Sequence, residues 1–385
     1  MQSYTETTEL PAPDLEADML LEEEESSDSY SQLVWQRFSR SKAAIAGALM
    51  VIMLVVLAMF PEFFSPYDFY NTTLSDTYIP PAEIRFFDVD GNFLFRPFVY
   101  KSELVIDPVT YQAKQALDTE HPHFIRFFVR SWEYKLFGLI ETDLHIIGLD
   151  GDEVRVHLLG TDRFGRDLWG RICLAGRVSL SLSILAAVIA IVIGSSVGVI
   201  SGYYGGKIDN AIQRFVEVVM SFPELPLWMA LAAVIPKTWP SGQIFLVMAF
   251  IFPFLRWAVL AREVRGKVLS LRETDFILAA KEQGAGDFRI IFKHLYPNVL
   301  SHVIVILTLM IPDIILAEAF LSFLGIGIQE PLTSWGFLMK SAQSLETLGQ
   351  NTWILTPVIF IVVAVLGLNF LGDGLRDAAD PYSNL

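Results

Sequence analysis

Six long apolar stretches constrain the fold of this 385-residue chain more than any other feature of its sequence. Each stretch approaches the roughly 20 helical residues that are needed to cross the ~30 Å hydrocarbon core of a bilayer. The stretches occupy residues 43–60, 178–200, 216–236, 243–261, 301–320 and 353–371. Because 53% of all residues are hydrophobic, a single water-soluble core is a poor model. The sequence therefore predicts an all-α polytopic membrane protein with six transmembrane helices.

Acidic residues are concentrated before the first apolar stretch. Residues 1–36 carry ten of the 43 Asp and Glu residues and no Lys or Arg. So much like charge, with few apolar residues, predicts a disordered acidic tail. The tail lacks the basic start and the small-residue cleavage site of a secretory signal. We therefore expect residues 37–60 to remain in the protein as an N-terminal anchor helix.

Short loops that are rich in Lys and Arg stay on the cytoplasmic side of a membrane. Residues 262–298 contain seven Lys or Arg residues, whereas residues 237–242 and 321–352 contain one each. This asymmetry predicts that residues 262–298 are cytoplasmic. With six spans, the acidic tail and the C-terminus are then also cytoplasmic, and residues 61–158 form an extracytoplasmic insertion between the first two spans.

The insertion is far longer than a connection between two helices requires, so we expect it to fold separately or to pack on a partner. Asp90-Gly91 and Asp150-Gly151 each lie between apolar or β-branched runs, which is a strong indication of a β-hairpin. The sequence therefore predicts a partly β insertion. Between the two expected hairpins, "HPHFIRFFVRSWEYKLFGL" is aromatic and basic, as is typical of a segment at a membrane interface.

Two features of the insertion invite a metal-binding interpretation. In "DVDGN" the glycine comes one ligand too early for a calcium loop, and no Glu follows at the required distance, so a plain turn is expected. His121 and His123 have no Cys or third His nearby and are expected at the surface or the interface rather than on a metal. No metal site is predicted.

Motifs for catalysis are missing from the sequence. "SGYYGGKI" has Ser201 in place of the first glycine of a P-loop and Ile208 after the lysine, so it cannot hold a nucleotide with Mg²⁺ in that way. Gly202, Gly205 and Gly206 are instead expected to form a tight turn between the second and third spans. If the activity of this chain requires ATP hydrolysis, another chain must carry it out.

Two short helices that meet at a bend are predicted for residues 274–298, which contain "FILAAKEQGAGDFRIIFKHLYPN". Gly284 can take the left-handed conformation that ends the first helix. Asp287 suits the start of the second helix, which Pro297 is expected to end. An interfacial connector and a docking site for another protein both require such an amphipathic pair, so both interpretations remain open.

The stretch resembles the "EAA" coupling loop of permease subunits in bacterial ABC importers. Ala279, Ala280, Gly284 and Pro297 fall at the intervals of that motif, whereas Leu278 replaces its Glu. The resemblance extends, in order, through "LGTDRFGRDLWGRICLAGRVSLSLS", "GYYGGKIDN", "AFLSFLGIGIQEPLTSWGFLM" and "LNFLGDGLRDAADP". Together these motifs resemble the C subunit of oligopeptide and dipeptide importers.

The resemblance implies a permease core over residues 159–385, whose coupling loop, residues 274–298, contacts a separate ATPase. The residues that it assigns to this contact are Ala279, Ala280, Gly284, Ala285, Gly286, Asp287 and Pro297. The implied partners are a second homologous permease subunit, two ABC ATPase subunits that use ATP and Mg²⁺, an extracytoplasmic solute-binding protein and the lipid bilayer. No nucleic acid is expected, and no cofactor bound by this chain. Alternating access in the bacterial cytoplasmic (inner) membrane is the implied mechanism.

Charged residues of opposite sign meet in "GTDRFGRD", which contains Gly160, Thr161, Asp162, Gly165, Arg166 and Asp167. Opposite charges in one loop commonly satisfy each other, so a structural role before the second span is expected rather than contact with a substrate. A re-entrant or interfacial turn is expected around Gly325 and Gly327, with Trp335 as a membrane anchor.

Acidic side chains within or beside the apolar stretches are candidates for a translocation path. They are Glu217, Glu224, Asp313 and Glu318. Since an acid facing lipid costs about 2.5–3.5 kcal/mol on insertion scales, these four are expected to face the bundle interior, one another or water. Lining of the path and internal pairing, with Arg214 or Arg256, remain open for each.

Three functions are compatible with these features. The first is the permease of an ATP-driven importer, with peptides as substrate by resemblance and with nickel chelates or sugars as alternatives. The second is a secondary transporter driven by an ion gradient, which the intramembrane acids suggest. The third is a membrane-tethered receptor whose insertion binds a ligand.

Overall fold

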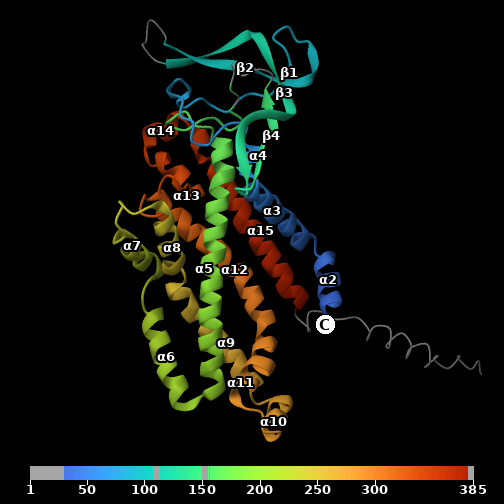
Figure 1. Cartoon of the computed structure of the whole chain (residues 1–385), viewed down its shortest axis with the longest axis vertical. Coiled ribbons are helices and arrows are strands. Elements are labelled where there is room, and N and C mark those ends of the chain that lie inside the picture. Colours follow the sequence, from blue (N-terminus) through green and yellow to red (C-terminus); the bar gives the residue numbers. More distant parts are fainter. Residues whose placement is uncertain (1–29, 107–112, 150–154, 156, 380–385) are drawn as a thin grey trace, which may run out of the picture.

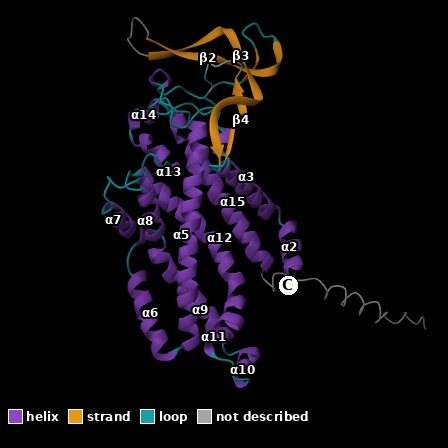
Figure 2. Cartoon of the chain, viewed as in Figure 1, coloured by secondary structure: helices purple, strands orange, loops and turns teal. Residues whose placement is uncertain are grey.

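The computed structural model describes residues 30–106, 113–149, 155 and 157–379, and it shows a helical bundle with a β-sheet at one end (Figures 1 and 2). We call this end of the bundle the sheet end. The opposite end, where helix α10 lies, is the elbow end.

Helices form the bundle. They are α2 (Tyr30–Arg40), α3 (Lys42–Met59), α4 (Pro61–Phe64), α5 (Leu168–Tyr204), α6 (Gly206–Met220), α7 (Glu224–Ala233), α8 (Ser241–Ile251), α9 (Pro253–Leu271), α10 (Asp275–Glu282), α11 (Asp287–Arg289), α12 (Tyr296–Phe323), α13 (Trp335–Leu338), α14 (Leu345–Gln350) and α15 (Thr356–Ala379). Five helical runs are long and apolar enough to span a membrane, and α6 with α7 makes a sixth if this bent pair is one span. The predicted polytopic helical architecture is confirmed.

The end of the predicted acidic tail is helical. Residues 1–29 lie outside the described part of the chain, but the prediction of disorder was wrong from Tyr30 onward, since α2 begins there. Phe38 of α2 packs with Ala44 of α3 and Ala378 of α15 in a small apolar cluster. The free energy gained by burying the Phe38 ring stabilises α2, although the residues before it are polar.

The third predicted span, residues 216–236, is not a straight helix. α6 and α7 are separated by a short break and differ in direction by 77°. Pro223 lies in this break with an extended backbone (ψ 127°). Because the proline ring disfavours helical backbone in the residue before it, the first helix stops and the second starts at a new angle.

Helix α5 runs the length of the bundle and packs closely on α9 (Figure 1). Gly194, Gly198 and Gly202 face α9 at four-residue intervals. A Cβ atom on Gly194 or Gly198 would lie 2.7 or 2.6 Å from a backbone oxygen of α9. Because residues four apart share one helix face, the three glycines form a seam along which the two backbones touch.

The predicted turn between α5 and α6 is confirmed. Gly205 and Gly206 have φ values of +63° and +56°, in the left-handed region that glycine adopts without steric cost. The helices therefore reverse direction within these two residues.

The sheet contains four antiparallel strands in the order β1-β2-β3-β4. They are β1 (Arg85–Phe87), β2 (Phe93–Ile106), β3 (Ala113–Leu136) and β4 (Ile140–Leu149). The predicted turn at Asp90-Gly91 is confirmed, with a φ of +84° at Gly91. The turn expected at Asp150-Gly151 lies outside the described residues. Strand β4 instead pairs with β3 through a turn at residues 137–139.

The sheet is attached to the bundle just beyond the end of α3. His145 of β4 is fully buried, and its two ring nitrogens lie 2.8 Å from the carbonyl oxygen of Glu62 and 3.0 Å from that of Trp132. The Glu62 carboxylate forms an ion pair with Arg177 of α5 at 2.9 Å. These contacts join the sheet, α4 and α5.

We expect a substitution of Gly47 by valine to separate α3 from α15. A Cβ atom at Gly47 would lie 2.7 Å from the backbone of Gly367 and Leu371, so the helices must move apart at a cost of about 2 kcal/mol or more. Thermal unfolding of the purified chain in detergent should occur at a lower temperature. Gly266→Ala is the matched control, since nothing lies within 4 Å of its added Cβ. An equal effect of both substitutions would contradict the contact.

Candidate functional site

The elbow comprises residues 274–298 and lies at the end of the bundle that is opposite the sheet (Figure 1). Ile277 of α10 is fully buried and fixes this short helix to the bundle. Asp287 accepts a hydrogen bond from the Tyr203 hydroxyl at the end of α5 (2.7 Å). Lys281 lies over the same tyrosine ring, at 5.4 Å from its centroid. Ile290, Ile291 and Leu295 of the elbow are also buried in the core of the bundle. The elbow is thus held firmly on its inner side, and its outer face is exposed in the described structure.

The bend of the elbow is formed by Gly284, as the sequence predicts. Its φ is +78°, and the amide of Ala285 donates a hydrogen bond to the carbonyl oxygen of Ala280 (3.0 Å) across the end of α10. No atom lies within 4 Å of the position that a Cβ on Gly284 would occupy. The backbone conformation, rather than a lack of space, therefore restricts this position to glycine.

The predicted contact residues from Ala279 to Asp287 flank the bend of the elbow, whereas Pro297 lies in the first turn of α12 and lines the neighbouring cavity. Exposed among them are Ala279, Gly284, Gly286, Asp287 and Pro297, whereas Ala280 and Ala285 are half-buried. The sequence analysis missed the apolar side chains beside them. Phe288 and Phe292 are 74% and 55% exposed, with ring centroids 4.4 Å apart. Because the two phenylalanines are four residues apart in a predicted helix, they could have been expected to lie side by side on one of its faces.

The prediction that Pro297 ends the second elbow helix was wrong. Helical backbone continues from Asp287 to Phe323, and Pro297 lies in the first turn of α12. The six residues before α12, Ile290–Leu295, form wider π-helical turns, whose shifted hydrogen bonds accommodate a residue without an amide hydrogen. The second half of the elbow, from Asp287 onward, is therefore continuous with α12.

Two of the four candidate acids share one arginine. Arg256 of α9 lies 2.9 Å from Glu224 of α7 and 2.9 Å from Asp313 of α12. Its guanidinium also lies over the Trp228 ring, at 5.8 Å. One cation thus joins three helices at the point where the bent pair α6 and α7 changes direction.

A cavity of about 850 Å³ opens beside this cluster. Its charged and titratable lining residues are Arg256, Glu263, Lys267, His302, Asp313 and Arg376. The remaining lining is mostly apolar and comes from α9 and α12, including Val305, Leu309 and Met310. The cavity therefore combines an apolar wall with charges of both signs, which suits a solute carrying both charges.

The other two candidate acids do not line this cavity. Glu217 forms an exposed ion pair with Arg214 (3.0 Å), one of the pairings that the sequence suggested. Glu318 is fully buried and accepts hydrogen bonds from the hydroxyls of Ser179 (3.1 Å) and Ser322 (2.6 Å). It therefore joins α5 to α12 inside the protein.

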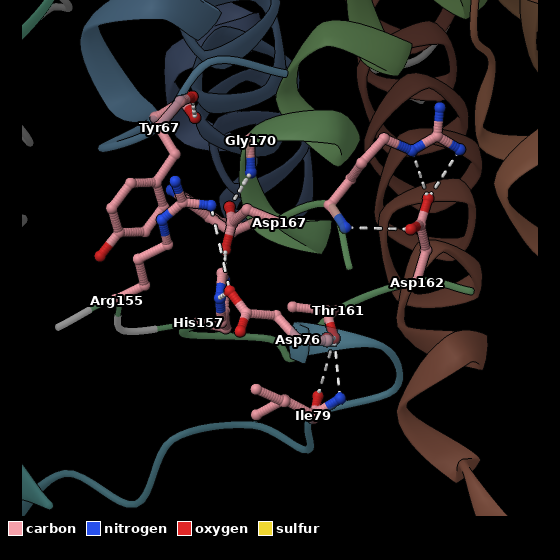
Figure 3. A network of polar contacts seen from close by, with 12 residues as sticks. Tyr67, Asp76, Ile79, Arg155, His157, Thr161, Asp162, Asp167 and Gly170 are labelled. Carbon is pink, nitrogen blue, oxygen red and sulfur yellow. Dashed lines mark hydrogen bonds and ion pairs between the residues drawn. The ribbon is translucent and has the colours of Figure 1, made fainter. Parts of the chain in front are cut away.

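The outer motif, residues 160–167, joins the start of α5 to the segment before the sheet (Figure 3). Asp167 caps α5 by accepting a hydrogen bond from the Gly170 amide (2.8 Å). The Thr161 hydroxyl accepts a hydrogen bond from the Ile79 amide (2.7 Å). Gly165 has a φ of +71°, and a Cβ there would overlap the carbonyl oxygen of a neighbouring loop residue. Capping and close approach account for these positions.

Charges within the outer motif pair as the sequence predicts. Asp162 accepts hydrogen bonds from the Arg166 side chain at 2.8 Å. Arg166 also contacts Glu330 (2.8 Å), and Arg171 lies 3.2 Å from the same carboxylate. Neither Glu330 nor Arg171 was among the predicted residues. Arg171 lies in a mostly apolar helix, and a basic residue there requires a partner, so its ion pair could have been expected from the sequence.

The expectation that Trp335 anchors the chain in the membrane interface was wrong. The residue is only 2% exposed, and its indole nitrogen donates a hydrogen bond to the carbonyl oxygen of Ile172 in α5 (3.0 Å). The predicted glycine turn before it is present, with a φ of +77° at Gly325. Burial against α5 satisfies the indole more completely than an interface would.

His157 is a further residue that the sequence analysis missed. It is buried between two carboxylates, with Nδ1 3.0 Å from Asp167 and Nε2 3.8 Å from Asp76 (Figure 3). Burial alone would lower the pKa of His157, but the hydrogen bond to Asp167 and Coulomb attraction to Asp167 and Asp76 outweigh it and raise this pKa to about 9. The imidazolium therefore joins the segment before the sheet to the cap of α5.

We expect the stability contributed by His157 to depend on pH. Its raised pKa favours folding fully below the ordinary value of 6.5, and this contribution is lost as the pH rises through about 9. The loss is at most about 3 kcal/mol. Thermal unfolding of the wild-type chain should occur at lower temperature as the pH is raised from 6 to 9.5, and His157→Gln should flatten this dependence. His121→Gln, at an exposed site, is the control. An unchanged pH profile in His157→Gln would rule out the role.

We expect Arg256→Gln to destabilise the contact between α7, α9 and α12. Loss of the guanidinium leaves Glu224 and Asp313 without their shared cation, at a cost of about 1–2 kcal/mol because all three groups are partly exposed. The triple variant with Glu224→Gln and Asp313→Asn should recover most of the unfolding temperature. Arg214→Gln should have little effect, since its ion pair is exposed. Additive losses in the triple variant would contradict a shared cation.

Two families of known proteins match separate parts of the chain. Residues 178–382 match the family model of the binding-protein-dependent transport system inner membrane component. Residues 29–81 match the N-terminal transmembrane domain of oligopeptide transport permease C. The two matches lie on either side of the β-sheet, whose strands run from Arg85 to Leu149.

Curated relatives are similar over most of their own length. The chain is 40% identical to the oligopeptide transport system permease protein OppC of Haemophilus influenzae, over 64% of this chain and 76% of that protein. It is 30% identical to the dipeptide transport system permease protein DppC of Bacillus subtilis, over 92% of this chain and 86% of that protein. An inward-facing structure of the MetNI methionine ABC transporter aligns with 52% of this chain and 93% of that chain, at 21% identity and a TM-score of 0.40.

The family model covers more than half of the chain and includes the elbow, the shared arginine and the buried Glu318. The relative from Bacillus subtilis extends the similarity to nearly the whole chain. The chain therefore belongs to the family of binding-protein-dependent transport system inner membrane components.

Proposed function

We propose that this chain is a permease subunit of an ATP-driven importer of oligopeptides or dipeptides. It would work with a second homologous permease subunit, two ABC ATPase subunits that use ATP and Mg²⁺, and an extracytoplasmic solute-binding protein. The names of its curated relatives, which are oligopeptide and dipeptide permeases, support the substrate class. This chain itself would neither hydrolyse ATP nor hold a cofactor.

The elbow is the observation that carries the proposal. It projects from the bundle and presents exposed aromatic rings, Phe288 and Phe292, beside small residues. Exposed apolar groups on a firmly held helix pair suit the cleft of another protein. The ATPase would bind here, with Ala279, Gly284 and Gly286 allowing close approach of its surface.

Motion of the elbow would be transmitted directly to the transport path. The helical run from Asp287 to Phe323 is unbroken, so α12 must follow when the ATPase moves the elbow. Asp313 of α12 lies on the wall of the large cavity. Closure of the ATPases around ATP would thus change the accessibility of the cavity, which is the requirement for alternating access.

The large cavity would form one half of the solute path, and the second permease subunit would supply the other. A peptide carries an ammonium group and a carboxylate, and the cavity offers both acidic and basic side chains. Because Arg256 offsets the charge of its acidic neighbours, the net charge of the cavity wall would be close to zero. Such a wall would accept zwitterions of different side-chain composition.

We place the elbow end in the cytoplasm and the sheet end outside the cytoplasmic (inner) membrane of a bacterium. The excess of Lys and Arg in residues 262–298 supports this orientation. Packing of α2 against the end of α15 supports placing both termini on one side of the membrane. The sheet would then face the solute-binding protein.

The intramembrane acids give less support to an ion-driven secondary transporter than the sequence suggested. Glu224 and Asp313 share Arg256, and Glu318 is held by two serine hydroxyls. Each of these acids has a partner within the protein, so a structural role accounts for its place in the bundle without an ion gradient. Uptake by the chain alone in liposomes without ATP would nevertheless overturn the importer proposal.

We expect Gly284→Val to abolish association with the ATPase subunits. Valine strongly disfavours the φ of +78° at this position, so the two elbow helices must change their relative direction. Copurification of the ATPases from cells that express the whole importer should be lost, together with uptake of peptides.

Gly91→Val is the matched control. Gly91 also has a positive φ (+84°) and nothing within 4 Å of an added Cβ, but it lies in a turn of the sheet, outside the elbow, so association with the ATPases should persist. Both substitutions introduce the same kind of backbone strain, and equal unfolding temperatures of the two variants would separate a docking defect from misfolding. Normal ATPase binding by a folded Gly284→Val chain would refute the role of the elbow.

A further inference from the structure

The turn between β3 and β4 is apolar and almost fully exposed. Phe137, Leu139 and Ile140 are 58%, 85% and 61% exposed. Turns at a protein surface are normally made of polar residues and glycine. Here only Gly138 is of that kind, and Phe137 has a φ of +51°, which a bulky side chain rarely adopts. Water is an unfavourable environment for these side chains.

The position of the turn along the bundle is fixed by an aromatic contact. The ring of Phe137 packs edge-on against that of Phe60, at 5.4 Å between centroids. Phe60 directly follows α3. The hairpin therefore reaches from the sheet down to the end of the first span (Figure 2).

The length of α3 places this contact at the edge of the bilayer. The helix has 18 residues, or about 27 Å, which barely spans a hydrocarbon core of about 30 Å. Both of its ends must then lie close to the two boundaries. Phe60, and with it the β3–β4 turn, lies at the boundary on the sheet end.

Charged and aromatic groups mark the same boundary. The ion pair between Glu62 and Arg177 lies just beyond α3. Lys135 and Glu141 form an exposed ion pair (2.9 Å) at the base of the turn. Trp132, which lies farther from the turn on β3, stacks on His145 of β4. Aromatic rings and exposed charges of this kind are typical of the headgroup region, whereas the turn beyond them is wholly apolar.

The exposed face of α3 continues into the turn. Its exposed apolar side chains are Ile45, Leu49, Ile52, Met53, Val55, Val56 and Met59. Such a face on a membrane span contacts lipid unless another protein covers it. Since Phe137 packs on the residue after Met59, the turn extends this apolar surface without interruption.

We propose that the β3–β4 turn is a membrane anchor, in which Phe137, Leu139 and Ile140 insert into the lipid boundary beside α3. The base of the turn, with Lys135 and Glu141, remains among the headgroups. The anchor holds the sheet at a fixed height and tilt above the membrane. It requires only that α3 spans the bilayer, and so it is independent of the substrate and of the ATPase.

A label at Leu139 tests the proposal. Cys173 is the single cysteine and is buried, so Leu139→Cys can be labelled with a nitroxide in the full chain. After reconstitution in vesicles of phosphatidylethanolamine and phosphatidylglycerol, power saturation compares collisions of the label with oxygen, which concentrates in lipid, and with a water-soluble nickel chelate. We expect collisions with oxygen to exceed those with nickel several-fold.

Phe95→Cys is the matched control. Phe95 is an exposed aromatic residue of the same sheet (91%), but it lies on β2, away from α3 (Figure 1), so its label should collide mainly with nickel. Ile140→Cys is a second test position if the first variant folds poorly. Equal access of nickel to the labels at 139 and 95 would overturn the proposal. Access of neither reagent to the label at 139 would also overturn it, because protein would then cover the turn.

Discussion

A charged side chain on an otherwise apolar helix must have a partner, and this requirement determines how the bundle is put together. Arg265 of α9 donates hydrogen bonds from Nε and Nη2 of its guanidinium to the two carboxylate oxygens of Asp209 in α6. Arg171 of α5 and Glu330 meet across 159 residues of sequence. Each such pair joins elements that are apolar elsewhere and that could otherwise slide past one another, since lipid and helix surfaces are equally apolar. Ion pairs and glycine contacts thus give the bundle its unique arrangement.

Features with a local physical cause were predictable from the sequence. The apolar stretches located the spans, because the thickness of the bilayer sets their length. Gly284, Gly205 and Gly91 were recognised as bends because a positive φ strongly favours glycine. The pairing of Asp162 with Arg166 was predictable for a similar reason, since the two residues are neighbours in one loop.

Features that depend on distant parts of the chain were not predictable. His157 is held between Asp76 and Asp167 only after the insertion has folded against α5. The sequence around Trp335 predicts an interfacial anchor, but in the folded chain α5 covers this residue. By local rules a proline at position 297 predicts the end of a helix. The preceding π-helical turns accommodate its missing amide hydrogen, so the helix continues. Tertiary contacts decide in each case between two locally acceptable conformations.

The single cation of Arg256 has a consequence for the hydration of the cavity. Two carboxylates on different helices rely on it, so any movement that draws α7 away from α12 leaves one carboxylate without its counter-ion. In a dry cavity this carboxylate would be too costly to leave bare, whereas water can solvate it. Since both carboxylates are already partly exposed, water that enters the cavity can take the place of the lost cation and make an opening between these helices possible.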